Sequence, residues 1–245
     1  MLYYERSGNT GGDTIVMIHG FLGSSDMFHK VVEELKEDYN IIRIDLPGHG
    51  KSKEEPGFQT LYDYAEAIAE VLKHEKVTNA TWLGHSMGGY ITLAALEKEI
   101  ADIDKAILAY SSASPDSPEA QKKRDQQKSD IEQNGVEAYI NNGIHTFFGD
   151  NPSAEDVAFA SRVGYEATAE GLMTALEAIK SRPDQTSFIH EVSIPILVIE
   201  GSQDAVVTPI ETENIAVQKI VTNTGHFGML EDAKSFVNAV RQFLG

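Results

Sequence analysis

The chain has 245 residues, no cysteine and a formal net charge of −18, from 38 acidic against 20 basic residues. Without cysteine there are no disulfides, no thiolate metal sites and no cysteine nucleophile. A surface this negative repels phosphate backbones and anionic lipid, which argues against nucleic-acid and membrane-surface roles.

The first part of the chain alternates predicted strands with predicted helices. Apolar, often β-branched runs predict strands at residues 14–19, 41–45, 80–84 and 103–110. Helix-forming runs lie between or after them, at about residues 26–36, 60–74 and 86–98. This alternation predicts an α/β fold with a mostly parallel sheet and helices on both faces. Ligands of such sheets bind at the carboxyl ends of the strands.

The alternation stops at Ser111. Between Pro115 and Pro183 no run predicts a strand, and helices are expected at about residues 118–133, 136–142, 153–166 and 168–181. We interpret this as a helical cap, residues 113–183, inserted into a core formed by residues 1–112 and 184–245. After Pro195 we expect further elements in the core: strands at 196–200 and 219–222, and helices at about 209–217 and 230–244.

Residues 80–95 predict a strand, a sharp turn and a helix, with Ser86 at the apex of a Gly-x-Ser-x-Gly sequence. The pentapeptide alone arises by chance in roughly one chain in ten of this length, so the strand before it and the helix after it carry the argument. The main-chain N–H of Met87 would lie in the first turn of the helix, where N–H groups lack partners and can bind an anion.

Two further residues follow predicted strands at the same edge of the sheet. Asp204 comes after the strand at 196–200 and His226 after the last strand. Together with Ser86 they supply a hydroxyl, a base and a carboxylate that orients the base, which predicts a catalytic triad. Asp116, beyond the strand that precedes the cap, is the alternative acid and the weaker one. His19, His49 and His85 are interpreted as structural loop residues, and no metal-ligand spacing is present.

These segments resemble the α/β-hydrolase superfamily, and in particular a serine carboxylesterase-like member with a helical cap. The segments are His19-Gly20-Phe21, Asp45–Ser52, Gly84–Gly89, Gly201–Asp204 and Gly225-His226. The resemblance runs from about residue 14 to 244 and is least specific in the cap. It implies that the N–H of Phe21 joins that of Met87 in an oxyanion hole.

The predicted function is therefore hydrolysis of a small or medium carboxylic ester through an acyl-enzyme on Ser86, with no cofactor. Serine at this position argues against dehalogenase and epoxide hydrolase chemistry, for which related families use Asp. Thioester, lactone or C–C bond hydrolysis stays open, and so does a slow-turnover ligand receptor or signalling protein. Related enzymes acting on C–C bonds of anionic substrates commonly carry an Arg near the serine. Tyr90 follows Gly89 here, and with the net charge this makes a strongly anionic substrate less attractive.

The cap contains a short apolar segment that predicts a substrate pocket. Ile144, Phe147 and Phe148 suggest an apolar site for the acyl or alcohol group, and His145 could touch the substrate. The expected partner is a small-molecule ester, with neither nucleic acid nor membrane, and the expected assembly is a monomer or homodimer. With no visible signal peptide or membrane-spanning run, a cytoplasmic location is expected.

Overall fold

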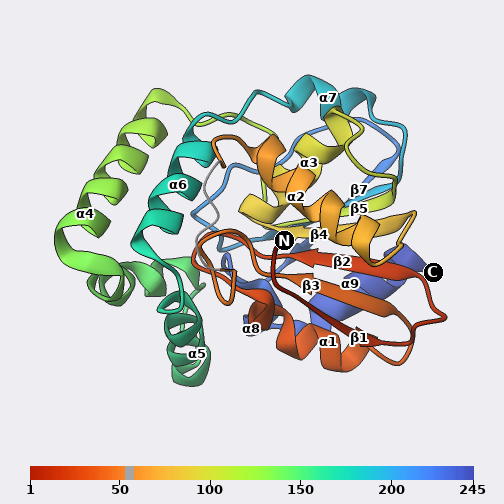
Figure 1. Ribbon diagram of the computed structural model, residues 1–245, viewed down its shortest axis with the longest axis horizontal. Coiled ribbons are helices and arrows are strands. Elements are labelled where there is room, and N and C mark those ends of the chain that lie inside the picture. The colour runs from red at the N-terminus through yellow and green to blue at the C-terminus, as the bar shows by residue number, and fades with distance from the viewer. Residues whose placement is uncertain (53–57) are drawn as a thin grey trace.

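A seven-stranded sheet forms the centre of the computed structural model, which describes residues 1–52 and 58–245 (Figure 1). Residues 53–57, within the core segment expected at 1–112, lie outside the described part. The strand order is β1-β3-β2-β4-β5-β6-β7, and every neighbouring pair is parallel except β1 with β3. The strands are β1 (Tyr4–Gly8), β2 (Thr14–Ile18), β3 (Asn40–Ile44), β4 (Ala80–His85), β5 (Ile103–Ala109), β6 (Ile196–Gly201) and β7 (Val217–Thr222). The predicted α/β class with a mostly parallel sheet is confirmed.

Helices cover both faces of this sheet, so its central strands are buried on both sides. On one face α2 (Leu61–His74) packs beside α3 (Met87–Glu97), and on the other α1 (His29–Leu35) packs beside α9 (Ala233–Leu244) (Figure 1). Because these strands are buried on both faces, their sequences are nearly continuous apolar runs. The short elements η1 (Ser25–Phe28) and α8 (Gly228–Glu231) lie near α1. No helix in the described residues combines the length and apolarity that crossing a bilayer requires.

The helical cap is inserted between β5 and β6 and extends beyond the sheet in Figure 1. Its elements are α4 (Pro118–Gly143), η2 (Ile144–Phe147), α5 (Ala154–Gly164) and α6 (Ala169–Lys180), with α7 (Thr186–Glu191) leading back to β6. Ser117 caps α4 by accepting from the N–H of Ala120, and Pro118 occupies the first turn. The backbone of α4 breaks at Gly135, where φ is 81°, so the two helical runs expected here meet at that residue. The cap boundaries at 113 and 183 stay a prediction.

Three elements differ from the expectations. The edge strand β1 was not predicted, because its five residues alternate only weakly and depend on pairing with β3. The short helix α7 was also not predicted. The helix expected at 209–217 is wrong, since residues 209–216 form a loop and β7 begins at Val217. There the N–H of Ile210 donates to Glu200 Oε1 at 2.8 Å, and the side chain of Asn214 donates to the carbonyl of Val192 at 2.8 Å. These distant partners compete with local helix formation.

Candidate active site

Ser86 stands at the strained turn between β4 and α3. Its backbone has φ 52° and ψ −115°, outside the regions that residues other than glycine favour. A side chain on Gly84 would place its Cβ 2.2 Å from the carbonyl oxygen of Gly88, so the turn requires glycine at that position. The sharp turn holds Ser86 at the carboxyl end of β4, largely but not completely buried.

Asp204 and His226, which follow β6 and β7, form a buried hydrogen-bonded pair. His226 Nδ1 lies 2.8 Å from Asp204 Oδ2, and the other carboxylate oxygen accepts from the N–H of Val206 at 2.8 Å. An ionised carboxylate can only accept, so this contact with an ionised Asp204 favours the tautomer of a neutral imidazole that carries its proton on Nδ1 and its lone pair on Nε2. This is the tautomer that a general base facing a serine needs.

His85 joins two segments of the site: the sharp turn at Ser86, called the elbow, and the loop after β7 that carries His226, called the histidine loop. Its Nε2 donates to the carbonyl oxygen of His226 at 2.9 Å, and the two imidazole rings lie 4.9 Å apart. Among the described residues no hydrogen bond links the Ser86 hydroxyl to His226, and His226 Nε2 has no partner. Such contacts are often long in unliganded sites and tighten with substrate. Within the described residues His226 Nε2 is therefore available as a hydrogen-bond acceptor.

Phe21 lies beside the serine, in the loop that follows β2. A Cβ on the preceding residue, Gly20, would lie 2.8 Å from Ser86 Cβ, which shows how closely this loop approaches the elbow. In the described residues the N–H groups of Phe21 and Met87 donate to no side chain and no loop carbonyl. The arrangement could hold an oxyanion between these two N–H groups.

A cavity of about 380 Å³ opens above Ser86 and below the cap. Its wall is formed by Phe21, Leu22, Ser86, Tyr90, Ala120, Lys123, Arg124, Gln127, Tyr139, Gly143, Thr146, Phe147, Ile179 and Val206. Of the four cap residues expected to bind substrate, the structure brings only Phe147 to this wall. Ile144 and Phe148 are buried in the hydrophobic core, and His145 is exposed.

Phe147 also contacts the predicted catalytic histidine through its main chain. Its carbonyl oxygen accepts from the N–H of His226 at 2.8 Å, and its ring stacks on Phe227 with centroids 5.2 Å apart. This link between cap and histidine loop was missed from the sequence. No local pattern reveals a contact between residues so distant along the chain.

The cavity wall carries positive charge. Lys123 and Arg124, both on α4, line it, and among its described lining residues there is no Asp or Glu. This cationic wall was also missed, because α4 is polar around most of its surface and the sequence does not show which side faces Ser86. The charged side chains that line the cavity are thus basic in an acidic protein, and one of them, Arg124, is paired with the carboxylate of Asp116.

Three buried histidines near the elbow are structural in their contacts: His19, His49 and His85. His19 Nδ1 donates to the carbonyl oxygen of Gly20 at 2.8 Å, while its Nε2 accepts from the N–H of Leu46 at 2.9 Å. Burial lowers the pKa of His49 to about 3, and it also lowers the pKa of His19 and of His85. All three rings are therefore neutral at physiological pH. Within the described residues no cluster of side chains is suited to a metal ion.

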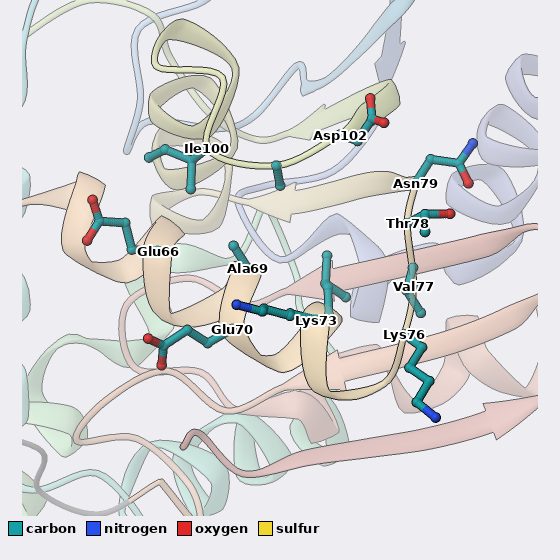
Figure 2. A pocket seen from close by; sticks show the side chains of 12 residues that line it. Glu66, Ala69, Glu70, Lys73, Lys76, Val77, Thr78, Asn79, Ile100 and Asp102 are labelled. Atoms are coloured by element: carbon teal, nitrogen blue, oxygen red, sulfur yellow. The ribbon is translucent and has the colours of Figure 1, made fainter.

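A second hollow, of about 610 Å³, lies at the opposite end of the sheet (Figure 2). It runs between α2 and the segments that precede β4 and β5, which contribute Asn79 and Asp102. Figure 2 shows charges of both signs around it, including Glu66, Glu70, Lys73 and Lys76. None of the predicted site residues reaches this hollow.

Residues 13–233 match the profile of the alpha/beta hydrolase fold family. The uncharacterized hydrolase YugF of Bacillus subtilis is 39% identical over 112 residues, which cover 45% of this chain and 41% of that protein. Esterase YbfF of Escherichia coli is 33% identical over 93 residues, 38% of this chain and 36% of that protein. The alignments thus span about two fifths of these curated relatives. A thermophilic esterase from Thermogutta terrifontis superimposes with a TM-score of 0.90 at 27% identity, covering 99% of this chain and 92% of that chain.

Proposed function

The chain belongs to the alpha/beta hydrolase fold family, and from that premise we propose that it is a hydrolase that cleaves a small or medium carboxylic ester through an acyl-enzyme on Ser86. One observation carries the proposal. The buried Asp204–His226 pair, 2.8 Å between Oδ2 and Nδ1, stands at the carboxyl edge of the sheet that also presents the strained Ser86. The esterases among the matched proteins support the same reaction class.

The proposed chemistry follows from the tautomer of His226. Ser86 Oγ attacks the ester carbonyl carbon as His226 Nε2 removes its proton, and Asp204 stabilises the imidazolium that forms. The N–H groups of Phe21 and Met87 bind the developing oxyanion, and one such donor is worth about 10²–10³ in rate. His226 then protonates the leaving alcohol. Water attacks the acyl-enzyme by the same route and frees the acid.

The size of the substrate is proposed from the cavity. A volume of about 380 Å³ accommodates a small or medium ester, and Phe147 supplies an apolar surface near His226. The mechanism uses no cofactor, and the proposed partner is a small-molecule ester. The cytoplasmic location and the monomeric or dimeric assembly stay predictions.

Hydrolysis of p-nitrophenyl esters from acetate to decanoate, by wild type and Ser86→Ala in parallel, tests the proposal. We expect rapid release by wild type, loss in the variant, and a chain-length optimum in the short-to-medium range. Equal and slow release by both proteins would contradict the proposal and favour the ligand-receptor alternative. A fluorophosphonate probe adds a direct readout, since it should label wild type and leave Ser86→Ala unlabelled.

A second candidate is hydrolysis of an ester, lactone or C–C bond in a substrate that bears a carboxylate. It is favoured by Lys123 and Arg124, whose basic side chains line the cavity. Their position next to the substrate counts for more than the net charge of −18, from which an anionic substrate was not expected. The test compares acid release from monomethyl adipate and from methyl hexanoate. If this candidate holds, the adipate ester is preferred and Lys123→Ala reduces that preference. Equal use of both esters by wild type would reject it.

A further inference from the structure

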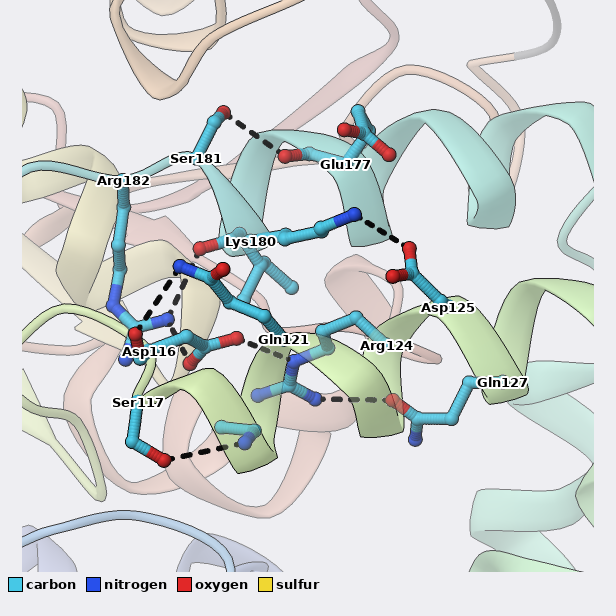
Figure 3. A network of polar contacts seen from close by, with 12 residues as sticks. Asp116, Ser117, Gln121, Arg124, Asp125, Gln127, Glu177, Lys180, Ser181 and Arg182 are labelled. Carbon is cyan, nitrogen blue, oxygen red and sulfur yellow. Dashed lines mark hydrogen bonds and ion pairs between the residues drawn. The ribbon is translucent and has the colours of Figure 1, made fainter.

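The carboxylate of Asp116 holds two arginines in a buried position between β5 and α4 (Figure 3). Arg182 Nη1 donates to Oδ1 at 2.5 Å, and Arg124 Nε donates to Oδ2 at 3.0 Å. Only 3% of the Asp116 side chain and 7% of the Arg182 side chain are exposed. Since Arg124 belongs to α4 and Arg182 follows α6, one carboxylate joins the beginning and the end of the cap.

From Arg124 a series of contacts runs around the wall of the cavity. Arg124 Nη1 donates to Gln127 Oε1 at 3.2 Å, and Gln127 Nε2 donates to the Tyr139 hydroxyl at 2.7 Å. The second bond spans the break at Gly135 and so ties the two halves of α4 together. The Tyr139 ring meets the Phe21 ring edge-on, with centroids 6.4 Å apart. The contacts therefore extend from Asp116 to the proposed oxyanion loop.

Arg182 makes a matching connection to the elbow helix. Its guanidinium carbon Cζ lies 4.4 Å from the centre of the Tyr90 ring, and its Nη1 also donates to the carbonyl oxygen of Ile179 at 3.1 Å. Tyr90 and Ile179 line the cavity, whereas Asp116 and Arg182 are not among its lining residues. Asp116 and Arg182 therefore lie outside the cavity, and Arg182 contacts the lining residues Tyr90 and Ile179 from the side that faces away from it.

The Asp116 pairs are more buried than the ion pairs that join α4 directly to α6. Neutralising a buried carboxylate leaves its two guanidinium partners facing each other without a counter-charge, which is strongly unfavourable. The nearby pair of Lys180 with Asp125, drawn in Figure 3, joins the same helices at 2.6 Å, with 25% and 56% of the side chains exposed. Solvent screens such a pair, and its loss costs little.

We propose that Asp116 is a positioning residue: through Arg182 and Arg124 it holds the α4 and α6 walls against the elbow helix, and it thereby sets the largest acyl or alcohol group that fits above Ser86. This inference rests on the proposed ester hydrolysis, because the size limit is measured through that reaction. Asp116 lies behind the cavity wall, so its effect falls on substrate size and not on the chemical step.

The test is Asp116→Asn, which removes the charge and keeps the shape, with Asp125→Asn on α4 as the matched control. The measured quantity is the ratio of kcat/KM for p-nitrophenyl octanoate to that for the acetate. We expect Asp116→Asn to shift this ratio by about tenfold, mainly through KM, with kcat for acetate within about twofold of wild type. The control should keep the wild-type ratio. A uniform loss on all esters would show a merely structural role and overturn the proposal.

Hydrogen–deuterium exchange of the same proteins separates this proposal from the proposed function, because it needs no catalysis. Exchange in α4 and α6 should rise in Asp116→Asn and stay unchanged in Asp125→Asn. Equal exchange in the two variants overturns the proposal even if ester hydrolysis is observed. Wild-type hydrolysis no faster than that of Ser86→Ala rejects the esterase function and the size limit with it, and exchange then decides whether Asp116 holds the cap. Should Asp116→Asn not fold, Arg182→Lys takes its place in both measurements, since it keeps the charge and loses the planar contact with Tyr90.

Discussion

The carboxyl edge of the sheet, where Ser86, Asp204 and His226 lie, and the cap are held in place by different kinds of bond. At the sheet edge the turn at Ser86 is set by main-chain geometry, and Asp204 is anchored by the N–H of Val206. In the cap, α4 and α6 contribute apolar side chains such as Ile131 and Leu176 to the core, and ionic side chains also hold them, some buried, as at Asp116, and others exposed, as at Lys180. Main-chain geometry tolerates little displacement, whereas helices joined through side chains can be displaced more readily. Substitutions at the edge should therefore change the rate on every substrate, and substitutions in the cap should change which substrates are accepted.

The largest effect is expected at the sheet edge, from Asp204→Asn. An amide can donate to His226 Nδ1 and so favours the wrong tautomer, which should lower kcat by about 10⁴-fold. Because the substitution impairs the general base His226 and not the substrate pocket, kcat should fall by the same factor for acetate and octanoate esters. Steady-state kinetics on both esters checks this. If kcat fell for only one of the two esters, substitutions at the sheet edge would not act on every substrate, and the contrast with the cap would be wrong.

A smaller effect concerns acid stability, since the neutral buried histidines belong to the sheet edge. Unfolded His49 binds a proton below a pKa of about 6.5, whereas the buried ring stays neutral down to about 3. The unfolded state thus gains the proton first, and stability falls as pH drops through this window. His49 alone should cost about 2 kcal/mol between about pH 7 and pH 5.

Urea denaturation at about pH 7 and about pH 5 measures this loss in the free energy of unfolding. His49→Gln should lose less stability on acidification than wild type. His145→Gln, at an exposed position in the cap, should behave like wild type. If His49→Gln loses as much stability as wild type, the acid sensitivity does not come from that buried imidazole.

The smallest effect is expected in the cap, from Phe147→Ala. Removing the ring widens the cavity near His226 and keeps the main-chain bond from His226 to residue 147. The preference between short and medium p-nitrophenyl esters should shift by about tenfold, with kcat on acetate nearly unchanged. Phe148→Leu is the control, because Phe148 does not line the cavity. An unchanged chain-length preference would count against a substrate role for Phe147.

The regular part of the fold was predictable because each strand and helix of the core carries its own periodic signal. The strand at 103–110 was predicted from its apolar run, and α2 from its spaced apolar residues. The edge strand β1 and the loop at 209–217 were not predicted, since their partners lie far away in the sequence. Asp116 illustrates the same limit. Its sequence position made it an alternative acid, whereas its partners in space are two arginines of the cap.

The sequence by itself determined the α/β class, the strained serine turn and the order of Ser86, Asp204 and His226, because strands, turns and loops that follow strands leave local patterns in the chain. The tertiary structure alone decided which side of α4 faces the serine, and thus that Lys123 and Arg124 line a cavity in an acidic protein. It also decided that Phe147, and neither Ile144, His145 nor Phe148, reaches that cavity. The physical reason is that α4 is polar on most sides, so its orientation depends on side-chain contacts between segments far apart in the chain.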